Sequence, residues 1–281
     1  MFAHVLVPTD LSAYSHAMIG CIGSIPGIEE VVLLHVQDPK ESKTGSGAAL
    51  LEEKRELSES GLSVSTILAP PPVDSVADEI LRTAAEMEAS LIIVGARGKG
   101  LVEELLLGSV SSSVVRHAPT SVLVMRHRVI KTLEGVAFEK FCPRIFSRIL
   151  VPTDLSEPSL APLTALLTRI RGVEEVILAH VVTRAGAAEI AQASVEDAEL
   201  VLGRICADLA GKGVRAEKRV RAGNPTHEIS RLAEEEDVSL LLVSLHGRGG
   251  GIRRALLGST AYSITEVAAR PVLIARPPAW E

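Results

Sequence analysis

The first half of the chain returns in its second half, in the same order and over nearly its whole length. Four pairs of segments carry the repeat. V-L-V-P-T-D-L-S at residues 5–12 returns as I-L-V-P-T-D-L-S at 149–156, and G-I-E-E-V-V-L-L-H-V at 27–36 returns as G-V-E-E-V-I-L-A-H-V at 172–181. L-L-G-S at 106–109 returns unchanged at 256–259, and S-V-L-V-M-R at 121–126 returns as P-V-L-I-A-R at 271–276. Each copy is far longer than the roughly 20–50 residues of a solenoid repeat, which indicates a duplicated domain. We predict a first domain at residues 1–127, a linker at 128–147 and a second domain at 148–281.

The composition narrows the class of protein. Hydrophobic residues make up 47% of the chain and aromatic residues only 2%, so the cores are built from Val, Ile, Leu and Ala. The scarcity of aromatic rings and the net charge of −6 argue against a nucleic acid as partner. No apolar run approaches the ~18 residues of a membrane span, and the N-terminus has no charged segment typical of a signal peptide. We expect a cytoplasmic protein that binds neither nucleic acid nor membranes.

The cysteines and the repeated histidines give no metal signature. Cys21, Cys142 and Cys206 are scattered and lack C-x-x-C spacing, a pattern that favours buried thiols in a reducing compartment over disulfides or zinc. His35 and His180 end apolar runs, and no second His or Cys lies at ligand spacing. We expect hydrogen-bonded histidines and no metal site.

Short β-branched runs alternate with helical patterns in each half. In the first half we predict strands at residues 5–8, 31–36, 64–68, 91–95 and 122–125. Between them we predict helices at residues 12–22, 48–60, 76–88 and 109–117. The strands are almost continuously apolar, as expected for strands covered on both faces. This alternation predicts an α/β fold in each half, with a five-stranded parallel sheet, right-handed crossovers and helices on both faces.

Several local features are predicted from the same patterns. Ser12 and Asp74 are candidate helix N-caps. The second helix of the second half is longer, at residues 187–211. The linker has three apolar anchors, Phe138, Phe141 and Phe146, and we expect it to pack on a domain. The charged runs at residues 52–56 and 234–237 are expected to be solvated helix faces.

The end of the first strand carries Pro8, Thr9 and Asp10, and its copy carries Pro152, Thr153 and Asp154. In doubly wound sheets ligands bind beyond the carboxyl ends of the strands, where the strand order reverses. An Asp there can accept a hydrogen bond from a ribose hydroxyl or from a metal-bound water. It can equally cap the next helix, as Ser12 can, and the sequence leaves both roles open.

The end of the fourth strand carries the pattern G-x2-G-x9-G-[ST], formed by Gly95, Gly98, Gly108 and Ser109. Glycines let the backbone approach phosphates, and Gly108-Ser109 opens a helix whose N-terminus attracts anions. Ser109 can cap that helix and donate its hydroxyl to a phosphate. The alternative is a glycine-rich turn with a Ser N-cap and no ligand. Its place after a buried strand favours the phosphate site.

Both halves resemble the universal stress protein family, through V-P-T-D-L-S, the strand ending His35-Val36, and the glycine pattern that runs into R-H-A-P-x-x-V-L-V at residues 116–124. The resemblance implies two tandem Rossmann-like domains, each with a site for ATP or a related adenine nucleotide such as AMP. It implies that Pro-Thr-Asp contacts adenine and ribose, that the Val36 backbone holds adenine and that the glycine loop wraps ribose and phosphates. The implied contacts in the first domain are Pro8, Thr9, Asp10, Val36, Val94, Gly95, Gly98, Gly108, Ser109 and Val110. The family also pairs domains through their last strands, here residues 122–125 and 272–275, and a homodimer of the chain is compatible with it.

The second copy departs from the glycine pattern. Ser244 stands in place of the first glycine, and ten residues instead of nine separate Gly247 from Gly258. The matching contacts would be Pro152, Thr153, Asp154, Val181, Gly247, Gly258 and Ser259. The loop is more basic than its counterpart, but backbone shape is harder to replace than exposed charge. We favour the first site and leave open whether the second binds a nucleotide with a shorter phosphate chain.

The leading hypothesis is an adenine-nucleotide-binding regulatory protein of the stress response, which holds ATP or AMP with or without Mg²⁺. A slow Mg²⁺-dependent ATP hydrolase is an alternative, although the chain lacks a Walker Lys-Ser/Thr, S-G-G-x-D-S and H-I-G-H, and no catalytic residue stands out. An interaction module with vestigial sites is the third hypothesis.

Overall fold

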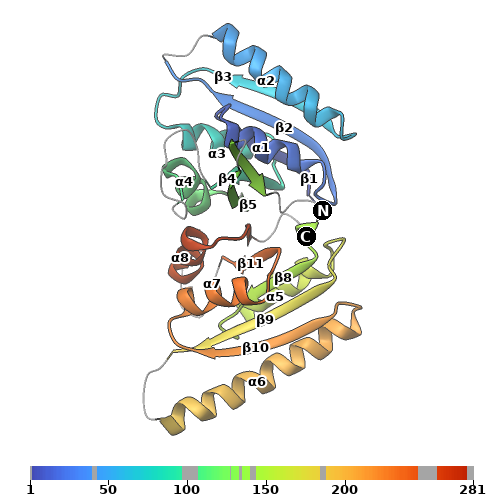
Figure 1. Cartoon of the computed structure of the whole chain (residues 1–281), viewed down its shortest axis with the longest axis vertical. Coiled ribbons are helices and arrows are strands. Elements are labelled where there is room, and N and C mark those ends of the chain that lie inside the picture. Colours follow the sequence, from blue (N-terminus) through green and yellow to red (C-terminus); the bar gives the residue numbers. More distant parts are fainter. Residues whose placement is uncertain are drawn as a thin grey trace. The chain divides into compact units, whose positions relative to one another are not determined.

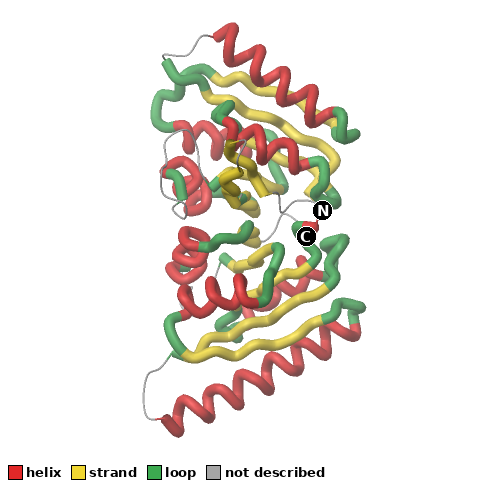
Figure 2. The backbone as a smooth tube through the Cα atoms, viewed as in Figure 1, coloured by secondary structure: helices red, strands yellow, loops and turns green. Residues whose placement is uncertain are grey.

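The computed structural model describes residues 2–39, 43–96, 107–126, 128–132, 135–139, 144–183, 188–245 and 258–276. The chain divides into two compact units, which we call unit 1 (Met1–Arg144) and unit 2 (Ile145–Arg276). Figure 2 shows that each unit has its own strands in yellow and its own helices in red.

Unit 1 alternates strands and helices along the chain. Its elements are β1 (Phe2–Pro8), α1 (Ala13–Ile22), β2 (Ile28–Val36), α2 (Lys43–Ser58), β3 (Ser63–Ala69), α3 (Val76–Glu86), β4 (Leu91–Gly95), α4 (Ser109–His117), β5 (Ser121–Met125), β6 (Arg128–Thr132) and β7 (Gly135–Glu139). The strands β1 to β5 and the helices α1, α3 and α4 agree with the sequence prediction to within three residues at each end, whereas α2 begins five residues before its predicted start. The antiparallel pair β6–β7 lies in the predicted linker, where no strand was expected.

The main sheet of unit 1 is parallel, with strand order β3-β2-β1-β4-β5. The chain adds β2 and β3 on one side of β1 and then crosses to add β4 and β5 on the other. Helices α1 and α2 contact each other, and so do α3 and α4. In Figure 1, α2 runs along the outer strands β2 and β3. The carboxyl ends of β1 and β4 therefore flank the point where the strand order reverses.

Unit 2 repeats this arrangement. Its elements are β8 (Arg148–Pro152), α5 (Glu157–Leu167), β9 (Glu175–Val182), α6 (Ala188–Gly211), β10 (Ala216–Ala222), α7 (Pro225–Glu235), β11 (Leu240–Ser244), α8 (Ser259–Val267) and β12 (Val272–Ala275). Its sheet is parallel, with order β10-β9-β8-β11-β12. The prediction of two tandem Rossmann-like domains, each with a five-stranded parallel sheet, is confirmed. Among the described helices, none is both long and apolar enough to cross a membrane.

The prediction that every strand is covered on both faces is wrong for β3 and β10. In β3 the side chains alternate between half-buried and exposed, and Ile67 is 38% exposed. In β10 most side chains are only half-buried. Each of these strands is the last in its sheet and contacts one helix, α2 or α6, so one face stays open to water.

The start of α3 differs from the prediction by one residue. Ser12 caps α1, as expected, and its hydroxyl accepts from the Ser15 backbone N–H at 3.3 Å. Ser75, not Asp74, caps α3, because Ser75 is the extended residue directly before the first helical turn and accepts from the Asp78 N–H at 3.1 Å.

The charged run at residues 52–56 is not uniformly solvated. Glu53 is only 4% exposed, although Glu52 and Arg55 are exposed. Leu50, Glu53 and Leu57 are spaced by three and four residues, so they share the helix face that packs on the sheet. The run at residues 234–237 is largely exposed, as expected, except for the half-buried Glu236.

The expectation of unpaired thiols is wrong for Cys21. This residue is 1% exposed on α1 and is disulfide-bonded. Cys142 lies outside the described residues. Cys21 has no second cysteine at a short spacing, which is why the sequence did not indicate a disulfide. Cys206 is free, as predicted, but it is half-buried instead of buried. Of the predicted linker anchors, Phe146 is buried, the side chain of Phe138 is not described, and Phe141 lies outside the described residues.

Candidate functional site

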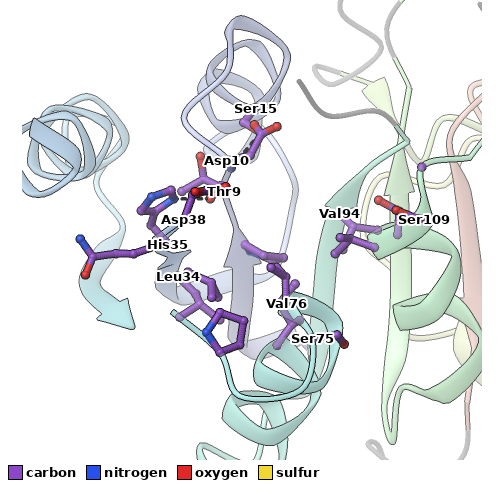
Figure 3. Close-up of a pocket in the computed structure, with 18 of the residues that line it drawn as sticks. Thr9, Asp10, Ser15, Leu34, His35, Asp38, Ser75, Val76, Val94 and Ser109 are labelled. Atoms are coloured by element: carbon purple, nitrogen blue, oxygen red, sulfur yellow. Dashed lines mark hydrogen bonds between the residues drawn. The ribbon is translucent and has the colours of Figure 1, made fainter. Parts of the chain in front are cut away.

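A cavity of about 850 Å³ lies at the carboxyl ends of β1, β2 and β4 in unit 1, where the strand order reverses. Figure 3 shows Thr9, Asp10 and His35 on one side of it and Val94 and Ser109 on the other. The cavity is lined by Pro8, Thr9, Asp10, Ser15, Leu34, His35, Val36, Gln37, Asp38, Pro39, Pro72, Asp74, Ser75, Val76, Ile80, Val94, Gly95, Gly108, Ser109, Val110 and Ser111. Its size falls within the roughly 300–1,000 Å³ of small-molecule sites.

The structure brings nine of the ten residues predicted for the first site to this cavity. They are Pro8, Thr9, Asp10, Val36, Val94, Gly95, Gly108, Ser109 and Val110. Gly98 lies outside the described residues. The sequence motifs did not indicate the wall formed by the segment before α3 and by α3 itself, although three consecutive prolines at residues 70–72 mark that segment.

The chain turns sharply after β1, and side chains hold the turn. The Leu11 N–H donates to Thr9 Oγ1 at 3.0 Å, and Leu11 has a left-handed φ of 58°. Asp10 Oδ1 accepts from the Ser12 N–H at 3.0 Å and from the Ser15 hydroxyl at 2.6 Å. Asp10 therefore stabilises the turn into α1 but is not its N-cap, and it also lines the cavity.

His35 fixes the end of β2 against the end of β1. Its Nδ1 lies 2.9 Å from the Thr9 carbonyl oxygen. Because a carbonyl only accepts, Nδ1 carries the proton and donates it. His180 makes the same contact with the Thr153 carbonyl at 2.8 Å in unit 2. The expectation that these histidines are hydrogen-bonded is confirmed.

A buried carboxyl lies behind the cavity wall. The Thr9 hydroxyl donates to Glu53 Oε1 at 3.1 Å, while Glu53 Oε2 has no partner among the described residues. Burial raises the pKa of Glu53, and this effect is partly opposed by the Thr9 hydrogen bond and by the charges of His16 and His35. The sequence signal for this residue was its place between Leu50 and Leu57 at helical spacing, which the surrounding charged run obscured.

The N-terminus of α4 faces the cavity without a side-chain cap. Gly108 is the N-cap residue, and its N–H donates to the Ala96 carbonyl at 2.9 Å. Ser109 is the first helical residue, so the prediction that its hydroxyl caps the helix is wrong. The Ser111 hydroxyl donates to the Gly95 carbonyl at 2.7 Å and joins the helix to β4. The backbone N–H groups of the first turn have no intrahelical acceptor, which makes this end suited to an anion.

The loop before α3 builds the far wall of the cavity. In unit 1 it runs from Pro70 to Ser75, and Pro72, Asp74 and Ser75 line the cavity together with Val76 and Ile80. In unit 2 only residues 223–224 separate β10 from α7. The proline ring fixes φ, so the three consecutive prolines stiffen the longer loop. The two units thus differ at this wall.

The described part of the second site matches the first at the turn after β8. The Leu155 N–H donates to Thr153 Oγ1 at 3.0 Å, and Asp154 Oδ1 accepts from Ser156, as Asp10 does from Ser12. Of the other residues predicted for this site, Pro152 ends β8 and Val181 lies in β9. Gly258 is the N-cap residue of α8 and provides no side-chain hydrogen bond, and Ser259 is the first residue of that helix. Gly247 lies outside the described residues. Both glycine loops therefore keep the same helix start.

The chemistry of a metal centre is not evident in the described part of the chain. No group of three or more His, Cys, Asp or Glu side chains there is placed to hold a metal ion. Asp10, Asp38 and Asp74 line the cavity as separate carboxylates. They supply hydrogen-bond acceptors for a ligand that carries hydroxyl or amino groups.

The model of the universal stress protein family matches residues 72–126 and 146–276, which is more than half of the chain. The chain belongs to the universal stress protein family. In the first half the match begins at residue 72, after the turn at Thr9 and the helix that carries Glu53.

Individual relatives agree with this assignment. The chain is similar to the universal stress protein MJ0577 of Methanocaldococcus jannaschii, with 28% identity over 160 residues that cover 46% of this chain and 97% of that protein. It is similar to a universal stress protein of Mycolicibacterium smegmatis, with 28% identity over 224 residues that cover 77% of this chain and 70% of that protein.

Solved structures share the fold over the whole chain. A universal stress protein from Archaeoglobus fulgidus matches with a TM-score of 0.67 and 23% identity, covering 97% of this chain and 96% of that one. The protein PA1789 from Pseudomonas aeruginosa, described as functionally unknown, matches with a TM-score of 0.70 and 20% identity, covering 98% and 93%. These similarities concern the fold.

Proposed function

We propose that the cavity of unit 1 binds an adenine nucleotide, ATP or AMP, and that this universal stress protein is a nucleotide-binding regulatory protein of the stress response. The observation that carries the proposal is the convergence of three elements on one cavity of about 850 Å³. These are the Pro8-Thr9-Asp10 turn, the end of β2 at Val36, and the uncapped N-terminus of α4.

The apolar side of the cavity suits a base. Val36, Pro72, Val76 and Ile80 offer apolar surface close to the carboxylates of Asp38 and Asp74. A purine ring can pack against the apolar side chains while an exocyclic amino group donates to a carboxylate. The Asp10 carboxylate lies at the same end of the cavity and can accept from a ribose hydroxyl.

The opposite end of the cavity suits phosphates. The N-terminus of α4 carries roughly +0.5 of an elementary charge from the helix dipole. Gly108 has no Cβ, so an oxygen can approach the backbone N–H groups of Ser109 and Val110 closely. Mg²⁺ would arrive with the nucleotide and neutralise part of the phosphate charge.

In this proposal unit 2 offers a second, weaker site. Its turn at Thr153 and its helix start at Gly258 match those of unit 1, but its wall before α7 is shorter. The pairing of the two domains through β5 and β12 also remains a prediction. Two separated lobes in a small-angle scattering profile would contradict it.

The decisive experiment is a calorimetric titration of nucleotide-free protein with ATP and with AMP, with and without Mg²⁺. A stoichiometry near one per chain supports a working site in unit 1 alone, and a value near two shows that unit 2 binds as well. No heat and no thermal stabilisation at millimolar nucleotide would refute the proposal and favour an interaction module.

A further inference from the structure

Helix α2 places a carboxyl where the packing calls for an apolar residue. Glu53 lies between Leu50 and Leu57 on the buried face of the helix and is 4% exposed. Its only hydrogen-bond partner in the described part of the chain is the Thr9 hydroxyl, at 3.1 Å from Oε1, and Oε2 has none there. Burying a carboxylate with an unpaired oxygen destabilises a protein, so the residue needs an explanation.

Among the described residues, the charged groups that act on Glu53 belong to the walls of the cavity or to the helix beside it. Asp10 follows β1, His35 ends β2 and His16 lies on α1. His16 in turn pairs with Glu56 on α2, with 3.3 Å between Nε2 and Oε2. Strand β3 brings no titratable side chain to the group. Glu53 itself does not line the cavity, but Thr9, Asp10 and His35 in front of it do.

Unit 2 shows that the turn does not require this carboxyl. Two buried leucines seven residues apart occur in both helices, Leu50 and Leu57 in α2 and Leu202 and Leu209 in α6. Aligning these pairs puts Ile205 at the position of Glu53. The Thr153 hydroxyl still accepts from the Leu155 N–H at 3.0 Å, as Thr9 does from Leu11. The Thr153 hydroxyl also lies 3.5 Å from the Ser159 hydroxyl, and Ile205 is half-buried. The turn therefore forms in unit 2 without a carboxyl at this position.

We propose that Glu53 is a positioning residue that makes the affinity of the unit 1 cavity for an anionic nucleotide depend on pH. The protonated carboxyl holds the Thr9 hydroxyl without adding charge. The ionised carboxylate holds it equally but adds a negative charge directly behind the wall that contacts the ligand. The inference rests on the proposed function, because it concerns the ligand of the same cavity.

The direction of the effect follows from linkage. Burial raises the pKa of Glu53 above its ordinary value of 4.5, so the carboxyl ionises at a higher pH than an exposed glutamate does. A ligand with negative phosphates favours the protonated form, so binding takes up a proton and tightens as the pH falls. Unit 2, with Ile205 at this position, lacks this dependence.

The test compares wild type with Glu53→Gln, which still accepts the Thr9 hydrogen bond but cannot ionise. The affinities for AMP and for adenosine are measured by calorimetry between about pH 5 and about pH 8. We expect the dissociation constant of wild type for AMP, divided by that of Glu53→Gln, to rise roughly fourfold across this range. This is the effect of two unit charges about 10 Å apart at a dielectric constant between that of protein and that of water. For uncharged adenosine the ratio should stay constant.

Two further variants control the comparison. Glu52→Gln removes an exposed carboxylate of the same helix, paired with Arg55, and should keep the wild-type pH profile. Glu53→Ile copies unit 2 and should give the same flat profile as Glu53→Gln. Binding of AMP with a constant ratio at all pH values would overturn the inference alone. Absence of binding by wild type to both ligands would overturn the proposed function and the inference with it.

Discussion

Gly108→Asp separates the stability of the phosphate-binding helix from its ability to bind phosphate. Gly108 is the N-cap residue of α4, with φ −61° and ψ 154°, a conformation that any L-residue adopts. No side chain caps this helix in the described structure, and Asp is among the best N-cap residues. The variant should therefore fold, with a free energy of unfolding equal to wild type or a few tenths of a kcal/mol higher.

The carboxylate introduced by Gly108→Asp lies where the phosphate of the nucleotide is expected to bind. Two unit charges about 4 Å apart near a protein surface repel by about 4 kcal/mol, and exposure to solvent lowers this value. A loss of about 2–3 kcal/mol corresponds to a roughly 30–150-fold weaker affinity for ATP in unit 1. Adenosine, which has no phosphate, should bind nearly as well as it does to wild type.

The matched control is Gly258→Asp, the same change at the N-cap residue of α8. A Cβ at Gly258 meets the Leu245 carbonyl oxygen at 3.7 Å, which is ordinary contact. This variant should leave the affinity of unit 1 unchanged. Calorimetry gives the affinities, and circular dichroism with urea unfolding gives the stability. An unchanged ATP affinity in a stable Gly108→Asp protein would refute the assigned phosphate position.

Three further predictions concern the wall, the buried carboxyl and the cysteines. Replacing the Pro70–Ser75 loop by Gly-Asn gives it the length found in unit 2. If the wall covers about 50 Å² of apolar ligand surface, this change should weaken nucleotide binding about tenfold. An unchanged affinity in a calorimetric titration would show that the wall does not contact the ligand. Glu53→Gln should raise the free energy of unfolding near neutral pH, and this gain should vanish below pH 4.5. The reason is that the pKa of Glu53 is raised in the folded state, so the wild-type protein loses stability as the carboxyl ionises with rising pH. Urea unfolding that shows the same difference between the two proteins at every pH would contradict this. Under denaturing, non-reducing conditions Cys206 should be alkylated and Cys21 should not, as peptide mass spectrometry can establish; alkylation of Cys21 without a reductant would exclude the disulfide.

The fold follows almost entirely from the sequence pattern. The strands of unit 1 are short apolar runs bounded by turn residues, and the helices carry an apolar face, so local periodicity places both to within a few residues. The repeat then gives unit 2 without further information. The exceptions lie at the sheet edge, where β3 and β10 are exposed on one side, because a strand's position in the sheet is not written in its own sequence.

The candidate site is predictable where one short segment carries it. Pro8-Thr9-Asp10 and Gly108-Ser109 are contiguous motifs, and parallel strands bring their carboxyl ends to one edge, so their meeting at one cavity could be foreseen. The cap of α4 could not be foreseen, because a Ser beside a Gly fits both the cap position and the first helical position.

The sequence by itself determined the duplication, the parallel α/β sheets and the motifs that meet at the cavity, since each depends on periodicity or on adjacent residues. Only the tertiary structure decided that Glu53 is buried behind Thr9 while Glu52 is exposed, that the proline loop walls the cavity, and that Cys21 is paired. These facts depend on which helix face meets the sheet and on which distant segments come together, and the free energy that fixes them comes from packing between elements rather than from local preference.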